Sequence, residues 1–274
     1  MSLDATRRAL SLTSLSTITT RKRIPMPRFS FLFLMAGLAV TSASADEMSA
    51  NKSAKTIFTV RIENVSTTDT LRSATGATAP APHSPGLWVV HTRKRVVFAE
   101  GKLDRGVGLE AQAEDGDPSR LAASIEKIKG ALASGVFNTP VGDDKPGPAL
   151  PGKAYEFSFA ASPGHRLTVT TMFGQSNDLF FAPGDDGIAL FESGEPIRGD
   201  LTGRFQLWDA GTEVNEEPGF GPNQAPRQAA PNTGPSERSP VRRIQDVHDG
   251  FAYPRVEQVI RVTITPRSSA VTAN

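Results

Sequence analysis

The sequence predicts an all-β protein with one helix, folded as an antiparallel β-sandwich of eight strands. Short segments with alternating apolar residues, many of them β-branched, recur along the chain, and this period of two is typical of half-buried strands. Gly- and Pro-containing turns separate these segments. Only one segment has helical periodicity. Many short strands with a single helix favour two layered antiparallel sheets.

The predicted strands are short apolar or alternating segments bounded by turn residues. They span residues 56–65, 87–91, 95–98, 154–159, 166–173, 188–191, 203–208 and 257–264. The first is the clearest, because Phe58, Val60 and Ile62 alternate with polar or smaller residues on the opposite face. Pro163-Gly164 predicts a tight turn that joins 154–159 and 166–173 as a hairpin.

The predicted helix begins after Asp117, a residue that favours the N-cap, and Pro118 fits the first helical position. Gly135 supplies a signal for the end of the helix. Four apolar residues recur at spacings of four, three and four, which places them on one stripe: Leu121, Ile125, Ile128 and Leu132.

The N-terminal segment has the layout of a secretory signal peptide. Arg21-Lys22-Arg23 precedes an apolar run from Phe29 to Val40, which ends near Ala43-Ser44-Ala45. The run is shorter than the roughly 20 apolar residues that span a bilayer. We therefore expect a signal peptide over residues 1–45, with Met26 as an alternative start, and a flexible leader over 46–55. An uncleaved anchor is the alternative.

Composition restricts the class of protein. Without residues 1–45 the chain has 24 basic and 28 acidic side chains, a net charge of −4, which argues against nucleic-acid binding. The absence of cysteine excludes disulfides, thiolate metal sites and cysteine nucleophiles. We expect an exported protein, periplasmic or extracellular, with no stable membrane insertion after signal cleavage. Its oligomeric state is left open.

A long Pro- and Gly-rich loop interrupts the domain that we expect over residues 56–266. It spans residues 214–243 and leaves no room for regular elements. Loops of this length are usually functional or disordered. Residues 267–274 form the predicted tail.

Polar side chains follow two predicted strands where each strand ends. Asn177 and Asp178 follow the 166–173 strand, and Asp209 and Glu213 follow the 203–208 strand. Ca²⁺ prefers six to eight oxygen ligands, which carboxylates, amides and loop carbonyls supply. Asp, Asn and Gly are also ordinary turn residues, so a plain turn is the alternative.

Four segments in order resemble the N-terminal domain of the spondin family in its bacterial exported form: residues 84–91, 108–117, 176–180 and 209–213. The last, Asp-Ala-Gly-Thr-Glu, is the most specific. The resemblance implies an eight-stranded, C2-like sandwich with a Ca²⁺ site at one end. It implies Asp178, Asp209 and Glu213 as ligands, and Asn177 with backbone oxygens would complete the shell. Glu213 stands where animal relatives often have Asp.

The function expected from this resemblance is non-enzymatic adhesion or binding to a surface ligand, either protein or glycan. The animal relatives carry cysteine-rich repeats that this chain lacks, so their matrix roles are not inferred. The alternative is a periplasmic hydrolase that uses Asp178, Asp209 and Glu213 as acid and base. Four aromatic residues near loops could form an exposed rim or plug the ends of the sandwich: Phe180, Phe181, Phe220 and Phe251.

Overall fold

A computed structural model describes residues 55–268 of the chain. The predicted signal peptide, the alternative start at Met26, the leader as far as residue 54 and residues 269–274 of the predicted tail lie outside the described residues. Among the residues that are described, none belongs to a helix with the length and apolar character needed to cross a membrane.

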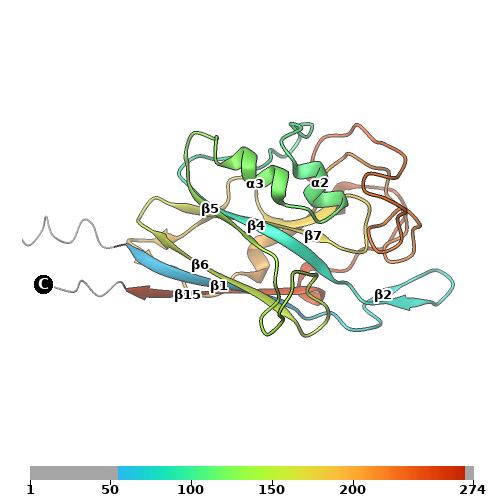
Figure 1. Cartoon of the computed structure of the whole chain (residues 1–274), viewed down its shortest axis with the longest axis horizontal. Helices are drawn as coiled ribbons and strands as arrows, with labels where there is room; N and C mark the ends of the chain where they lie inside the picture. The colour runs from blue at the N-terminus through green and yellow to red at the C-terminus, as the bar shows by residue number, and fades with distance from the viewer. Residues whose placement is uncertain (1–54, 269–274) are drawn as a thin grey trace, which may run out of the picture. The chain divides into compact units, whose positions relative to one another are not determined.

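One main sheet is antiparallel and has the strand order β12-β15-β1-β6 (Figure 1). Its strands are β12 (Gly199–Asp200), β15 (Ile260–Ser268), β1 (Thr56–Asn64) and β6 (Ala154–Ala161). β1 pairs with β15 on one side and with β6 on the other, without a register shift. The predicted alternation holds in β1, because Phe58, Val60 and Ile62 are fully buried.

The second main sheet has the order β14-β13-β8-β7-β4-β5, and β9 also pairs with β7. Its strands are β14 (Arg242–Arg243), β13 (Phe205–Asp209), β8 (Leu179–Pro183), β7 (Arg166–Phe173), β4 (His83–His91), β5 (Ala131–Phe137) and β9 (Ile188–Ala189). Two small hairpins pair β2 (Leu71–Arg72) with β3 (Thr78–Ala79) and β10 (Phe191–Glu192) with β11 (Glu195–Pro196). Short 3₁₀ turns are η1 (Thr202–Arg204), η2 (Ile244–Asp246) and η3 (Val256–Gln258).

The larger core contains side chains from both main sheets. Trp88 of β4 stacks on Phe157 and Phe159 of β6, with ring centroids 5.8 and 5.5 Å apart. Gly135 of β5 allows the indole to lie there, because a Cβ at Gly135 would be 2.7 Å from the Trp88 ring. Tyr155 and Phe137 continue this aromatic row, with centroids 5.0 Å apart.

Two short helices cover the other face of the second sheet: α2 (Leu109–Glu114) and α3 (Ser119–Ile125). A second core contains buried residues from the helices, the sheet and the segment before α2: Leu109, Leu121, Ile125, Phe180, Trp208 and Phe98. The central strands of this sheet are therefore buried on both faces, and every residue of β8 is buried. Such strands favour continuous apolar sequence over alternation.

The predicted mostly β chain with antiparallel sheets is confirmed. Within residues 55–268, eight strands have five or more residues and several others have only two. The predicted strand at 95–98 is wrong: these residues do not pair, yet Val96, Val97 and Phe98 are buried in the second core. The predicted strand at 188–191 is divided between β9 and β10. β15 continues through Ser268, into the predicted tail.

The extent of the predicted helix is also wrong, and a second helix, α2, was not expected. α3 ends at Ile125, and Gly130, with a φ of 98°, follows in a left-handed conformation. Leu132 and Gly135 therefore belong to β5 and not to a helical stripe. Phe180 and Phe181 are fully buried, so they are core residues and not part of an exposed rim, whereas Phe251 is 38% exposed.

His83 at the start of β4 makes the folded state sensitive to acid. It is fully buried, its Nε2 has no partner among residues 55–268, and burial lowers its pKa to about 3. Because the unfolded chain binds the proton near pH 6.5, stability is fully present above that pH and is lost as pH falls toward 3. We expect this group to contribute a slope to the free energy of unfolding that rises to about 1.4 kcal/mol per pH unit between pH 5 and 4. Urea unfolding of His83→Gln between pH 7 and 5 should show a shallower slope than the parent chain, whereas the exposed control His248→Gln should not. Equal slopes for all three proteins would contradict this.

Candidate functional site

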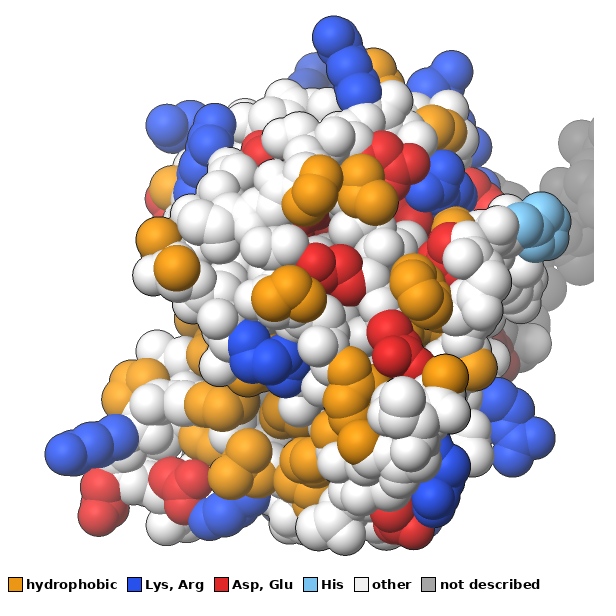
Figure 2. Space-filling view, turned by 90° about the vertical axis from the view of Figure 1, so that its right-hand side faces the viewer, with side chains coloured by type: hydrophobic (Ala, Val, Ile, Leu, Met, Phe, Trp, Pro, Cys, Tyr) orange, Lys and Arg blue, Asp and Glu red, His pale blue; other side chains and the backbone are white. Residues whose placement is uncertain are grey.

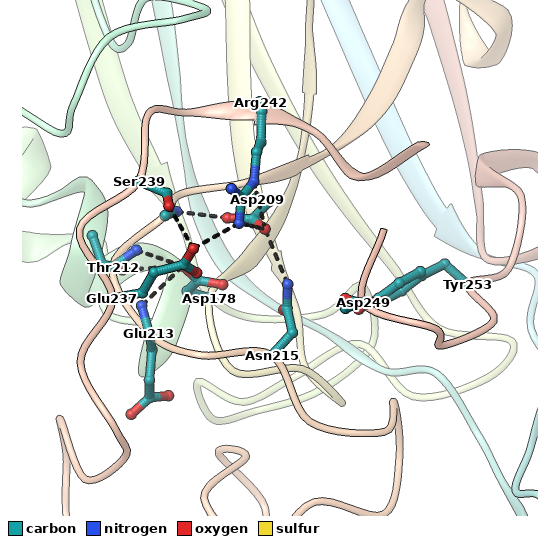
Figure 3. Close-up of polar contacts among 11 residues, drawn as sticks. Asp178, Asp209, Thr212, Glu213, Asn215, Glu237, Ser239, Arg242, Asp249 and Tyr253 are labelled. Atoms are coloured by element: carbon teal, nitrogen blue, oxygen red, sulfur yellow. Dashed lines mark hydrogen bonds and ion pairs between the residues drawn. The ribbon is translucent and has the colours of Figure 1, made fainter. Parts of the chain in front are cut away.

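The two predicted polar loops meet at one end of the second sheet (Figure 3). Asp178 directly precedes β8, and Asp209 is the last residue of β13, where it pairs with Leu179. The backbone N–H of Ala210 donates to the carbonyl of Asp178 at 3.2 Å. Both carboxyl side chains have no exposed surface. The antiparallel pairing of β8 with β13 therefore places two buried acids together.

Asp178 has one oxygen that is satisfied and one that is not. Its Oδ2 accepts hydrogen bonds from the backbone N–H groups of Thr212 at 2.8 Å and Glu213 at 3.2 Å. Its Oδ1 is buried without a partner among the described residues. Burial raises the pKa of Asp178, and the nearby charge of Asp209 raises it further. An ionised Asp178 thus lacks full compensation within the protein.

Asp209, in contrast, already has a cationic partner. Its Oδ1 accepts a hydrogen bond from the Gly211 N–H at 2.7 Å, and its Oδ2 accepts one from Asn215 Nδ2 at 3.0 Å. Arg242 Nη2 lies 3.1 Å from the same Oδ2 and 2.9 Å from a carboxylate oxygen of Glu237. Burial raises the pKa of Asp209, while the Arg242 guanidinium lowers it. Gly211 has a φ of 71°, a conformation that favours glycine at this turn.

Glu213 lies in the same loop, but its carboxylate points away from Asp178 and Asp209 (Figure 3). Its Oε2 accepts a hydrogen bond from Asn177 Nδ2 at 3.3 Å. Its Oε1 lies against Gly234, where a Cβ would be 1.9 Å away. Asn177 Oδ1 accepts from the backbone N–H of Glu216 at 3.0 Å, so both ends of this amide hold the loop. The carboxylates of Asp178, Asp209 and Glu213 thus do not converge on one point, and over residues 55–268 no three His, Cys, Asp or Glu side chains are grouped closely enough to hold a metal ion.

Glu114 is a residue of this site that the sequence reasoning did not single out. It ends α2, is only 3% exposed, and its Oε2 has no partner in the described part of the chain. Burial raises its pKa to about 7, the Thr212 side chain opposes this shift, and the charge of Glu213 adds to it. The only sequence signal was its place in the 108–117 segment of the resemblance, because nothing in its spacing relates it to Asp178.

The long loop forms an ordered polar wall around these acids. Gln224 is fully buried, and its Oε1 accepts from the Gly219 N–H at 3.0 Å. Arg227 donates to Gln224, to Gln175 and to the carbonyl of Gly221. The prediction that 214–243 lacks regular elements holds except at β14. Figure 2 shows several acidic side chains among apolar and uncharged ones on this end of the molecule.

Two hollows lie on the surface of this part of the molecule, and the acids line neither of them. One of about 660 Å³ is lined by Leu71, Glu217 and Phe251, among others. Another of about 420 Å³ is lined by Arg243 and Tyr253, among others. Neither is lined by Glu114, Asp178, Asp209 or Glu213.

The sequence matches no protein-family model, and no curated protein matches it. The proposed function therefore rests on the contacts within the site.

We expect Arg242→Gln to lower the free energy of unfolding by about 3 kcal/mol, because it leaves the buried Asp209 carboxylate without its cation. Urea unfolding at pH 7 measures the change. Arg204→Gln is the matched control, since it breaks an ion pair with Glu192 whose side chains are 44% and 59% exposed. Such surface pairs contribute about 0–1 kcal/mol. Equal losses in the two variants would show that Asp209 does not depend on Arg242.

Proposed function

We propose that the chain is an exported Ca²⁺-binding β-sandwich module of spondin type, which acts without catalysis in adhesion or surface binding. One observation carries this proposal: two buried carboxyl oxygens, Asp178 Oδ1 and Glu114 Oε2, have no partner among the described residues. A buried polar atom without a partner is rare in folded proteins, and a bound ion is one explanation of such an atom. The resemblance to the spondin family supports the same conclusion.

The donor set fits a hard cation. Asp178 and Glu114 would supply carboxylate oxygens, and both lie close to Thr212, which bonds to Asp178 and opposes the pKa shift of Glu114. Backbone carbonyls and water would complete the six to eight oxygens that Ca²⁺ requires. Asp209 would support the site through Arg242 and Gly211 without binding the ion directly. Asn177 and Glu213, predicted as ligands from the sequence, would hold the loop around it.

A bound cation would offset the charge of buried acids that otherwise repel one another. It would also connect two segments that are far apart in sequence, the end of α2 and the loop before β8, and the loop after β13 is hydrogen-bonded to the second of these. Because the ion would bind only the folded chain, it would stabilise the fold by mass action. Eight strands of five or more residues are consistent with the C2-like architecture that the resemblance implies.

No specific contact in the site supports the alternative of a periplasmic hydrolase. A substrate would have to reach the carboxyls, and Asp178 and Asp209 have no exposed surface. The predicted signal segment supports export to the periplasm or the extracellular space. The surface ligand remains a protein or a glycan in this proposal.

We expect millimolar Ca²⁺ to raise the melting temperature relative to EDTA. If the concentration is about 100 times Kd, the gain is about 2.7 kcal/mol, which corresponds to several degrees for a domain of this size. Asp178→Asn and Glu114→Gln should each abolish most of the shift. In EDTA both variants should be at least as stable as the parent chain, because each removes an uncompensated buried charge. Scanning calorimetry with and without Ca²⁺ measures both effects.

Asp144→Asn, an exposed acid outside the site, is the matched control and should keep the full Ca²⁺ shift. Mg²⁺ at equal concentration should give a smaller shift, because it prefers a smaller octahedral site. The proposal fails if the parent chain melts at the same temperature in Ca²⁺ and EDTA, or if Asp178→Asn keeps the shift.

A further inference from the structure

The end of the molecule opposite the acidic loops is formed by the last residues of β4 and the first of β7. His91 of β4 pairs with Arg166 of β7. A tight turn connects Arg166 to Ala161 of β6, which pairs with Thr56, where β1 begins. β1 therefore begins, and β15 ends, at this same end of the molecule (Figure 1).

Three of the exposed cations at this end are Arg93, Lys127 and Lys129. None of them forms an ion pair within residues 55–268. The Thr92 N–H donates to the Gly130 carbonyl at 3.0 Å, which joins the turn after β4 to the segment before β5. The Arg93 side chain lies over Gly130, where a Cβ would be 2.6 Å from its Cγ and Cδ, and so it lies beside Lys129. The neighbouring Lys94 and Arg95 are instead paired with Asp186 and Asp185.

An exposed leucine, Leu132, lies two residues after Gly130, at a β-bulge in the pairing of β5 with β4. Val90 pairs with Ala133, but His91 pairs with Ala131, so Leu132 has no partner on β4. Bulges of this kind redirect a side chain at the edge of a sheet. Leu132 is 51% exposed, the same fraction as Leu150 and more than any other exposed large apolar residue of the described chain. We call Arg93, Lys127, Lys129 and Leu132 the basic face.

We propose that the basic face binds the surface of an anionic phospholipid bilayer. Clustered lysines and arginines are attracted to anionic headgroups, and an apolar side chain among them can enter the interface. A soluble polyanion would bind the three cations, but Leu132 would not contribute to its affinity. Residues 46–274 have a net charge of −4, and −7 without these three cations, so an anionic bilayer would attract this face in preference to the rest. Thr56, where β1 begins, would then lie at the end that faces the bilayer, and the acidic loops would face away from it.

This proposal does not depend on the Ca²⁺ site, and sedimentation with vesicles tests it in EDTA. The chain as exported, after removal of the signal segment, is mixed with vesicles of phosphatidylcholine alone or with added phosphatidylglycerol. We expect binding only to the anionic vesicles, and loss of that binding at about 0.5 M salt, where charges are strongly screened. The triple variant Arg93→Gln, Lys127→Gln, Lys129→Gln should bind about 100-fold more weakly, from about fivefold per cation. Leu132→Ser should bind roughly tenfold more weakly.

Two matched controls keep the test specific. Lys145→Gln, Arg238→Gln, Arg255→Gln removes three exposed cations from elsewhere, and Leu103→Ser alters a leucine that is 45% exposed in another loop. Both controls should bind like the parent chain, and circular dichroism should show that every variant is folded. Equal losses in the two triple variants, no binding to anionic vesicles, or retention on heparin without vesicle binding would each overturn the proposal.

Discussion

The burial of Asp178 and Asp209 side by side is the constraint on which the rest of the acidic end depends. Both side chains have no exposed surface, and an ionised carboxylate removed from water needs hydrogen bonds or a cation for each oxygen. The loop after β13 supplies hydrogen bonds to both oxygens of Asp209 and to Oδ2 of Asp178. Gly211 takes a left-handed conformation and donates to Asp209, and the next two backbone N–H groups donate to Asp178. β14 then brings Arg242 beside Asp209.

The same constraint explains how a loop of about thirty residues can be ordered without regular elements. Fixing each backbone residue costs roughly 1–2 kcal/mol in entropy, and a Pro- and Gly-rich segment has no ladder of hydrogen bonds to offset this. Here hydrogen bonds of polar side chains offset this cost. Asn177 bonds to the Glu216 backbone and the Glu213 side chain, and Arg227 donates to both Gln224 and Gln175. Such networks are stable when every member is satisfied. One carboxyl oxygen of Asp178 and one of Glu114 have no such partner among the described residues.

Sequence reasoning succeeded where the pattern is local and failed where tertiary contacts decide. The alternation in β1 reflects one buried face, and it was predictable. The four-three-four spacing that ends at Leu132 was not a reliable helix signal, because it continues past Gly130, where the chain turns into β5. Gly135 was predicted to end the helix. In the structure a glycine is needed at this position because the Trp88 ring of the neighbouring strand lies against it.

The candidate site also has features that the sequence could predict and features that it could not. The meeting of Asp178 and Asp209 could be expected, since each follows a strand of the predicted sandwich. The partnership of Asp209 with Arg242, thirty-three residues later, could not, because no periodicity relates the two positions. The direction of the Glu213 side chain depends on its contacts with Asn177 and Gly234. The position of Glu114 depends on the packing of α2 against β7 and β8. These are contacts of the folded chain, and their partners are distant in sequence.

The two charged ends of the molecule act independently for a geometric reason. β4 and β7 are antiparallel, so the turn that carries Arg93 and the loop that carries Asp178 lie at opposite ends of β7. Eight residues of strand span roughly 25 Å, whereas the screening length at physiological salt is about 8 Å. Exposed charges at one end therefore have little effect on the other. A cation bound among the acids would leave the basic face unchanged, and a bilayer at the basic face would leave the acidic loops free for a second ligand. A domain whose residues 46–274 have a net charge of −4 can in this way present a cluster of cations at one end, and the antiparallel topology determines which end.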